Sequence, residues 1–206
     1  MPPVDVDAVC NAPTPRRATR VAAGALCVWF SIMVVLGAGL LARHLIALPA
    51  PSKANALPGY VNALRGPDEA GGWLAVHVLY AECRCSQRIV DHLATSERPW
   101  GFREIVLWVG EAAPPTALGA RFDVRRVGAS ELARADIEGA PLLIAADPSG
   151  EVRYAGGYTS RKQGPEIEDL AILAAARGTT PRSSLPLFGC AVSERLKAHL
   201  AKLPPL

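Results

Sequence analysis

A run of 22 residues without a charged side chain, from Val21 to Ala42, constrains this chain more than any other feature of its sequence. At a rise of 1.5 Å per residue, such a helix reaches about 33 Å, which is enough to cross a hydrocarbon core of about 30 Å. A secretory signal has a shorter apolar core, of about 7–15 residues. We therefore expect a retained transmembrane helix over residues 21–42. Cleavage of a signal near residues 54–56 is the alternative.

Basic residues flank this apolar run unequally, and their distribution indicates its orientation. Arg16, Arg17 and Arg20 precede the run, whereas Arg43 alone follows it closely. The positive-inside rule then leaves residues 1–20 in the cytoplasm as a short tail. We expect a single-pass protein of the cytoplasmic (inner) membrane, with its soluble domain on the periplasmic side.

The charge of the chain is concentrated in its first quarter. The formal net charge is +3, from 22 basic and 19 acidic side chains. Residues 1–56 hold five basic and two acidic residues, so the remainder has 17 of each sign. Nucleic acid is therefore not expected as a partner, because affinity for phosphates needs an unbalanced cationic face.

The rest of the chain divides into three segments by composition. Residues 43–69 include the stretch PAPSKANALP and predict a polar, proline-containing linker. Residues 70–178 alternate between strand and helix patterns, and residues 179–206 form a C-terminal extension that carries Cys190. The predicted strands lie at residues 73–80, 104–109 and 122–127, with a hairpin over 142–156, and the predicted helices at 86–94, from Ser130, at 166–177 and at 192–203. A strand–helix–strand start closed by an antiparallel hairpin predicts an α/β fold, a mixed β-sheet with flanking helices.

Five cysteines carry the candidate chemistry: Cys10, Cys27, Cys83, Cys85 and Cys190. The expected orientation puts Cys10 in the cytoplasm and Cys27 within the membrane, where it would pack as a small apolar residue. Three thiols remain in the exported part. In an oxidising compartment they indicate either one disulfide with an exchange partner or a metal site.

The Cys83-Arg84-Cys85 motif stands where the first predicted strand ends and the first helix begins. A helix N-terminus presents unpaired N–H groups and a partial positive charge, which favour a thiolate. Arg84 and Arg88 would add to this effect, and Glu82 would oppose it. A thiolate is the species that attacks a disulfide, so the position suits exchange chemistry. A Cys83–Cys85 bridge would require Cys83 to lie outside the helix; two inert structural cysteines are the alternative.

Cys190 follows the loop-like segment Leu185-Pro186-Leu187-Phe188-Gly189. That segment could fold back over the end of the sheet and make Cys190 a resolving thiol or a third ligand beside Cys83 and Cys85. A lone buried cysteine is the alternative, and the sequence leaves the choice open.

The order of these elements resembles the thioredoxin-like superfamily. The resemblance covers residues 70–178: a strand, a cysteine motif, a helix and a strand, then Gly139-Ala140-Pro141 and the Leu142–Tyr154 hairpin. It implies a cis-proline at Pro141 beside the active cysteines, with Ala140 and Pro141 shaping the groove for a partner's extended chain. More narrowly, the chain is similar to small membrane-tethered, exported members of the RedB type, which have a CxC motif and a late Phe-Gly-Cys.

Two functional hypotheses follow. The first is a membrane-anchored periplasmic thiol–disulfide oxidoreductase in which Cys83, Cys85 and Cys190 are catalytic, with protein thiols or disulfides as partners and no cofactor beyond the redox-active disulfide. Which cysteine attacks first is open. The second is a copper(I)-binding or metal-delivery module on the same fold, in which the same three sulfurs are the ligands, since thiolates select soft metals.

Overall fold

The computed structural model describes residues 16–66, 71–162, 164–178 and 182–202. It divides into two compact units, Met1–His44 with Pro204–Leu206, and Leu45–Leu203. We call the second of these the folded unit.

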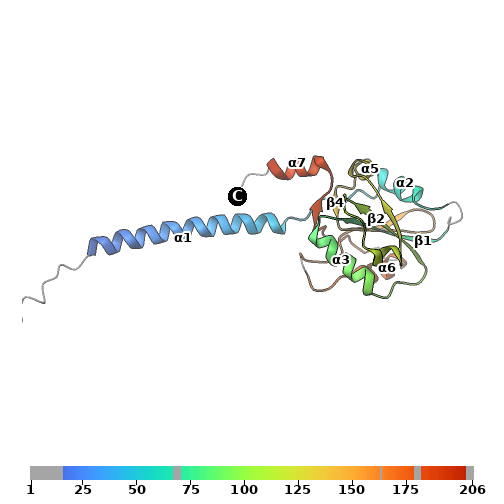
Figure 1. The fold of residues 1–206 in the computed structure, drawn as a ribbon, viewed down its shortest axis with the longest axis horizontal. Coiled ribbons are helices and arrows are strands. Elements are labelled where there is room, and N and C mark those ends of the chain that lie inside the picture. The colour runs from blue at the N-terminus through green and yellow to red at the C-terminus, as the bar shows by residue number, and fades with distance from the viewer. Residues whose placement is uncertain (1–15, 67–70, 163, 179–181, 203–206) are drawn as a thin grey trace, which may run out of the picture. The chain divides into compact units, whose positions relative to one another are not determined.

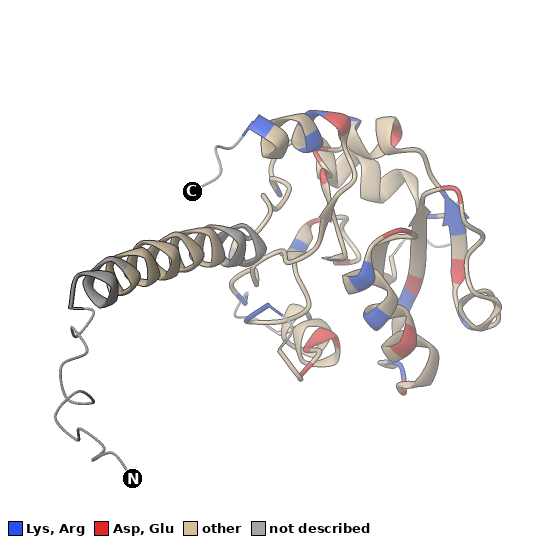
Figure 2. Cartoon of the chain, turned by 60° about the vertical axis from the view of Figure 1, so that its left-hand side comes forward, with Lys and Arg blue, Asp and Glu red and all other residues tan. Residues whose placement is uncertain are grey.

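The first unit is dominated by helix α1 (Arg16–Leu45). It contains Ala22–Gly39, a stretch of mean hydropathy 2.0 that is long and apolar enough to cross a membrane. Figure 2 shows no charged residue along this stretch. The predicted span, residues 21–42, therefore lies inside a single longer helix, and Cys27 is exposed on it. The expected tail is described only from residue 16, which is already helical, so Cys10 lies outside the described residues.

The folded unit consists of short helices around one five-stranded sheet, beside which lies a separate two-stranded sheet (Figure 1). Its elements are α2 (Ala56–Ala63), β1 (Trp73–Tyr80), α3 (Arg84–Thr95), β2 (Phe102–Val109), α4 (Thr116–Gly119), β3 (Asp123–Arg126), α5 (Ala129–Arg134), β4 (Gly139–Ala140), β5 (Leu142–Ala146), β6 (Val152–Gly156), α6 (Asp169–Ala176), β7 (Cys190–Ala191) and α7 (Glu194–Lys202). The expected α/β class is thus confirmed. The predicted helix over residues 166–177 begins only at Asp169, because Glu168 takes the N-cap position.

Strand β1 lies at the centre of a five-stranded mixed sheet of order β3-β2-β1-β5-β6. It runs parallel to β2, with Trp73 opposite Phe102 and Tyr80 opposite Val109. It runs antiparallel to β5, where His77 faces Leu143. All six interior residues of β1 are buried, as expected for a central strand covered on both faces.

The two faces of the sheet carry separate apolar cores. Alternate residues of β1 supply each of them, with Leu74 and Val76 on one face and Ala75 and Leu79 on the other. Helices α2, α5 and α7 cover the first face, and α3, α4 and α6 cover the second. The ribbon in Figure 1 shows α2 and α5 on the side of the sheet opposite α3 and α6.

The prediction of a linker over residues 43–69 was wrong for its central part. Helix α2 forms there, and its Leu57 and Val61 are completely buried against the sheet. Further upstream, the Leu48 N–H donates to the carbonyl of Leu187 at 2.7 Å. This segment therefore belongs to the folded unit. Its burial explains the helix better than local propensity does, since α2 contains a proline and a glycine.

The C-terminal extension is also part of the folded unit. Strand β7 pairs with β4 in a separate two-stranded sheet, and Leu196 of α7 is buried in the first core. Polar contacts hold the start of α7: Ser193 Oγ donates to Glu138 Oε1 at 3.0 Å, and Arg195 Nε donates to the same oxygen at 2.6 Å. These contacts bring Cys190 next to Ala140 of β4.

Candidate functional site

Cys83 occupies the N-cap position of α3, with extended backbone angles of φ −100° and ψ 116°. It lies outside the helix, as a Cys83–Cys85 bridge would require. The turn is fixed by two bonds: the Cys83 N–H donates to Tyr80 O at 3.0 Å, and the Tyr80 N–H donates to Ser86 Oγ at 3.0 Å. Ser86 is completely buried and ties the end of β1 to the first turn of α3. The sequence analysis missed this role.

Cys190 reaches the site through the ladder between β4 and β7. Ala140 is paired with Cys190, and Gly139 with Ala191. The preceding residue, Gly189, is pressed against the backbone, because a Cβ built there would lie 1.8 Å from Ala140 O. Only glycine fits such an approach. Of the two interpretations left open for Cys190, the structure therefore shows the one that places it near the motif.

The structure brings Cys83, Cys85 and Cys190 together as one thiol cluster. Hydrogen bonds from the thiols of Cys190 and Cys85 hold the pKa of Cys83 far below its ordinary value, and the N–H groups of Ser86 and Cys85 act in the same direction. Burial of Cys83 opposes this lowering. The same hydrogen bonds raise the pKa values of Cys85 and Cys190, and so do burial and the charge on Cys83. The cluster thus gives up its first proton easily and its second with difficulty.

Pro141 follows a cis peptide bond, Ala140–Pro141, as the resemblance implied. Cys83 Sγ lies 3.7 Å from the carbonyl oxygen of Ala140 and can donate to it when protonated. An ionised Cys83 has no proton to give, so in that state its stabilising partners are the neighbouring S–H and N–H groups. Ala140 and Pro141 therefore lie beside the cysteines.

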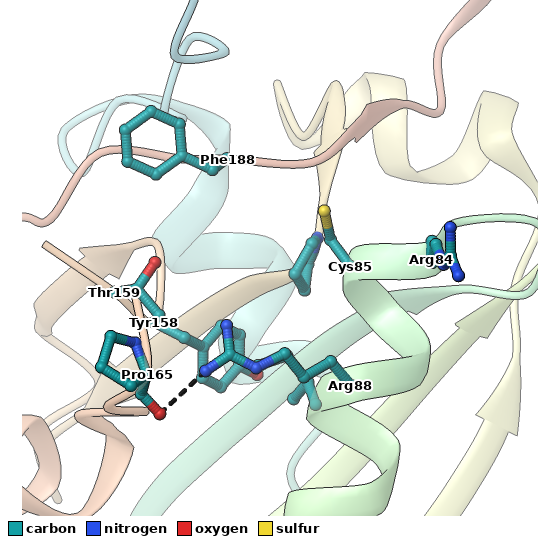
Figure 3. Close-up of a pocket in the computed structure, with 9 residues that line it drawn as sticks. Arg84, Cys85, Arg88, Tyr158, Thr159, Pro165 and Phe188 are labelled. Atoms are coloured by element: carbon teal, nitrogen blue, oxygen red, sulfur yellow. Dashed lines mark hydrogen bonds between the residues drawn. The ribbon is translucent and has the colours of Figure 1, made fainter. Parts of the chain in front are cut away.

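Cys85 is the member of the cluster that faces a pocket, whereas Cys83 is completely buried. The pocket has a volume of about 440 Å³ and is lined by Arg84, Cys85, Arg88, Ile89, Pro141, Tyr158, Thr159, Pro165 and Phe188. In Figure 3, Cys85 extends from the start of α3 toward the segment that carries Phe188, and Arg88 reaches across to Pro165. A substrate entering this pocket would meet Cys85 first.

The charges near the cluster differ in part from the expectation. Arg88 and Lys162 act on Cys85, and their positive charges partly offset the rise of its pKa. Glu82 is directed elsewhere, since its Oε1 accepts the Glu111 N–H at 3.3 Å. The lowered pKa of Cys83 has its largest causes in the other two thiols, and arginine is not among them. Lys162 and the pocket residues after β6 were not recognised from the sequence.

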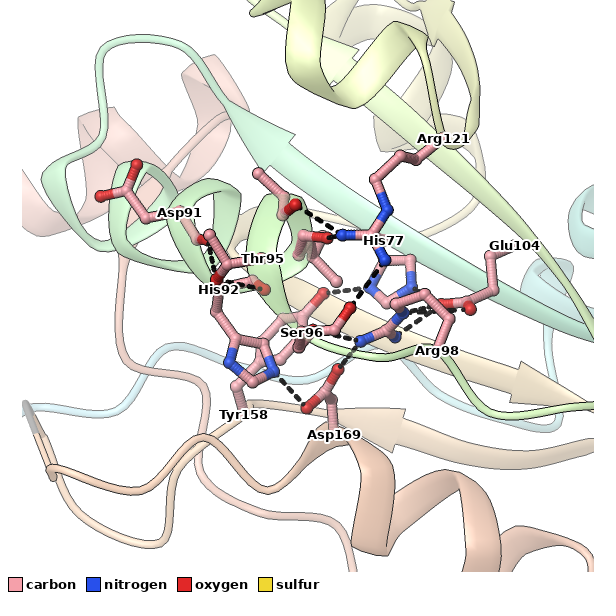
Figure 4. Close-up of polar contacts among 12 residues, drawn as sticks. His77, Asp91, His92, Thr95, Ser96, Arg98, Glu104, Arg121, Tyr158 and Asp169 are labelled. Carbon is pink, nitrogen blue, oxygen red and sulfur yellow. Dashed lines mark hydrogen bonds and ion pairs between the residues drawn. The ribbon is translucent and has the colours of Figure 1, made fainter.

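A buried polar network begins at the pocket wall with Tyr158 (Figure 4). The Tyr158 hydroxyl lies 2.8 Å from His77 Nδ1, and His77 Nε2 lies 2.8 Å from Glu104 Oε2. Burial opposes the ionisation of Glu104, but hydrogen bonds from His77 and Arg98 keep its pKa below the ordinary value. Burial raises the pKa of Tyr158 well above its ordinary value, so Tyr158 stays neutral.

The network continues through Arg98 to the start of α6. Arg98 Nη2 lies 2.6 Å from Glu104 Oε2, and Arg98 Nη1 lies 2.8 Å from Asp169 Oδ2. Asp169 is completely buried, and its other oxygen lies 2.8 Å from His92 Nε2. Every charged group of this network has a partner, so the network holds α3, β2 and α6 together beneath the pocket.

Within the described residues, no group of three or more His, Cys, Asp or Glu side chains is arranged to hold a metal ion. The copper(I) hypothesis thus depends on the three cysteines changing their arrangement when they bind the ion.

Comparisons with known proteins give no family. No family model matches the chain, and no curated protein matches it. An uncharacterized conserved protein from Geobacillus kaustophilus is 16% identical, with a TM-score of 0.44 over 72% of this chain and 90% of that chain. A hypothetical protein from Sinorhizobium meliloti is 15% identical, with a TM-score of 0.42 over 60% of this chain and 80% of that chain. These similarities are too weak to carry an argument about function.

Proposed function

We propose that this chain is a thiol–disulfide oxidoreductase with a thioredoxin-like fold. The observation that carries the proposal is the position of Cys83, which is buried at the start of α3 between two other thiols and beside Ala140 O. Three neighbouring thiols, one of which loses its proton easily, are suited to disulfide exchange, because a thiolate attacks and a neighbouring thiol resolves.

Several features support the thioredoxin-like assignment. The cysteine motif lies between a central parallel strand and the helix after it, and a cis-proline precedes the antiparallel hairpin of β5 and β6. These are the elements on which the resemblance in the sequence depends. Pro141 lies in the wall of the pocket that Cys85 faces.

We infer the roles of the cysteines from their accessibility. Cys85 lines the pocket and attacks first, whereas the buried Cys83 acts within the protein. The single negative charge of the cluster lies mainly on Cys83, which has the lower pKa, so attack by Cys85 uses the minor form in which the Cys85 proton has moved to Cys83 along their hydrogen bond. Cys85 Sγ then bonds to one substrate sulfur, the substrate S–S bond breaks, and the leaving thiolate takes the proton held by Cys83.

The second step resolves the mixed disulfide. Cys83 Sγ attacks Cys85 Sγ, a Cys83–Cys85 bond forms, and the remaining substrate sulfur leaves as a thiolate that is protonated by water. Two electrons have then passed from the protein dithiol to the substrate disulfide. Cys190 is hydrogen-bonded to Cys83 and could displace Cys85 from this bond, which would return Cys85 to its thiol form. The reverse sequence oxidises a partner's dithiol.

We further propose that α1 anchors the chain in the cytoplasmic membrane, with the folded unit on the periplasmic side. The support is the apolar stretch Ala22–Gly39 and the three arginines that precede it, Arg16, Arg17 and Arg20. An oxidising compartment would allow a disulfide to persist in the folded unit. Protein thiols or disulfides at the membrane surface would be the partners.

The proposal is tested by thiol counting in the full chain in non-ionic detergent, equilibrated with dithiothreitol and with glutathione buffers of graded redox ratio. We expect one two-electron couple that disappears in Cys83→Ala and in Cys85→Ala/Cys190→Ala, whereas Cys27→Ala retains it. Three thiols that stay reduced across all buffers would contradict the proposal. Stoichiometric copper(I) bound through the same cysteines, without a dithiol couple, would favour the metal-delivery alternative.

A further inference from the structure

Positive side chains gather around Cys85. Arg84 and Arg88 line the pocket, one at the first position of α3 and one a turn further along. Lys162 lies near enough that its charge acts on both Cys85 and Cys190. The three cations come from two separate segments of the chain and lie near Cys85, the cysteine that lines the pocket.

Among the residues that the structure describes, none of these three cations forms an ion pair with a carboxylate. Arg88 Nη2 donates to the carbonyl oxygens of Gly164 and Pro165, the second at 2.9 Å, and both acceptors are uncharged. Those bonds fix the guanidinium and leave its Nε–H and Nη1–H donors without a partner among the described residues. Neither Arg84 nor Lys162 forms an ion pair with a carboxylate of a described residue.

The described residues of the pocket wall also include no acidic side chain. The nearest carboxylate in the sequence, that of Glu82, is turned toward Gly110 and accepts the Glu111 N–H. The apolar part of the wall is supplied by Ile89, Pro141 and Phe188. A positive field focused in a partly apolar cavity raises the local concentration of anions, and guanidinium groups bind carboxylates with matched geometry.

We propose that this pocket selects disulfides and thiols that carry a carboxylate close to the sulfur. Arg88 and Lys162 would hold the carboxylate while the substrate sulfur meets Cys85, and Phe188 would cover the apolar part of the substrate. A cysteine flanked by Asp or Glu in a partner protein has this chemistry, and so does a small anionic thiol. The inference rests on the exchange activity proposed above and names its substrate class.

Alkylation of Cys85 tests the charge preference without requiring any redox activity. The reduced full chain in non-ionic detergent is treated with iodoacetate or with iodoacetamide, which differ mainly in charge. Trypsin cleaves after Arg84, so the adducts of Cys83 and Cys85 fall on separate peptides for mass spectrometry. We expect the iodoacetate-to-iodoacetamide rate ratio at Cys85 to exceed that of the urea-unfolded chain by about 10-fold at low salt. The ratio should fall toward the unfolded value at about 0.5 M KCl.

Three variants separate the pocket charges from the overall charge. Arg88→Gln and Lys162→Gln should each lower the ratio several-fold. Arg134→Gln removes the same charge from α5, which packs on the opposite face of the sheet, and should leave the ratio unchanged. A ratio equal to that of the unfolded chain, or one that neither salt nor the two pocket variants alter, would overturn the proposal.

Exchange rates with charged disulfides then test whether the preference for anions extends from alkylation to thiol–disulfide exchange. Rates are measured with dithiodipropionate, with cystamine and with two matched cysteine peptide disulfides flanked by Glu or by Lys, each normalised to its rate with free cysteine. We expect about 10-fold faster normalised exchange with the anionic member of each pair. A gain confined to the peptides indicates a protein segment as substrate, and a gain confined to dithiodipropionate indicates a small thiol. Equal normalised rates would overturn the selection by charge but leave the proposed exchange activity intact. If none of the four disulfides is exchanged although iodoacetate is preferred in the alkylation, only the exchange activity is overturned.

Discussion

Ala140 and Cys190 are paired across the short antiparallel ladder of β4 and β7, far apart in the sequence and adjacent at the site. This pairing brings the C-terminal thiol to Cys83, whose sulfur lies 3.7 Å from the carbonyl oxygen of the same Ala140. The cis peptide bond and the three cysteines are therefore parts of one local arrangement. Displacing β7 should affect the thiol chemistry without altering the cysteines themselves.

Gly189→Ala tests that dependence. The added Cβ would lie 1.8 Å from Ala140 O, and backbone atoms cannot yield as a flexible side chain can. We expect a loss of about 1–3 kcal/mol in the free energy of unfolding and faster alkylation of Cys190. Gly119→Ala is the matched control, since a Cβ there meets no atom within 4 Å. Equal stability and equal Cys190 reactivity in both variants would show that the close approach is unimportant.

The opposite pKa shifts within the thiol cluster predict that its three thiols titrate in separate steps. Because the pKa of Cys83 is lowered and those of Cys85 and Cys190 are raised, one thiolate should be present near neutral pH and the other two only in strong alkali. Thiolate absorbance at acid to alkaline pH, in a Cys10→Ala/Cys27→Ala background, measures this directly. Cys190→Ala removes a hydrogen-bond donor, so the pKa of Cys83 should rise and its thiolate should form at higher pH. Three thiols that titrate together near the ordinary value of about 8.5 would be inconsistent with the cluster.

The buried network beneath the pocket makes a stability prediction. The Arg98 side chain is 14% exposed and bridges Glu104 and Asp169, so Arg98→Ala leaves two buried carboxylates without their cation. We expect a cost of about 3–5 kcal/mol in the free energy of unfolding, measured by urea titration with tryptophan fluorescence. Arg125→Ala breaks an ion pair with Asp123, whose side chain is more than a third exposed. It should lower the free energy of unfolding by less than about 1 kcal/mol. A similar loss in both variants would remove the structural role assigned to the network.

Helix α2 supplies the fourth prediction. Leu57 is completely buried, so Leu57→Ala should destabilise the folded unit by about 2–5 kcal/mol. Leu170→Ala, at a position 38% exposed on α6, should cost clearly less in the same urea titration. If Leu57→Ala is as harmless as Leu170→Ala, residues 56–63 behave as the flexible linker that the sequence first suggested.

Local patterns predicted the parts of the fold that local physics controls. The apolar run of β1, the motif at the start of α3 and the turn of the β5–β6 hairpin each have a short-range signal, and the cis bond at Pro141 followed from the resemblance. Helix α2 was missed because its proline and glycine resemble a linker, although Leu57, Tyr60, Val61 and Leu64 have the spacing of one helix face.

The missed parts of the site depend on long-range pairing. The two-residue strands β4 and β7 are too short to show a period, so nothing local indicates that Ala140 meets Cys190. Tyr158 lines the pocket, and the charge of Lys162 acts on Cys85, only because the segment after β6 returns to the start of α3. Ser86 is an ordinary serine in the sequence and acquires its role from the turn that it closes.

The order of attack is the central claim, and trapping of mixed disulfides tests it most directly. The full chain is prepared as Cys83→Ala/Cys190→Ala and as Cys85→Ala/Cys190→Ala, and each is exposed to the same peptide disulfide. The account predicts that a stable adduct accumulates on Cys85 in the first variant, mapped by mass spectrometry, and that Cys83 in the second variant gains little. An adduct that forms on Cys83 as readily as on Cys85 would contradict it.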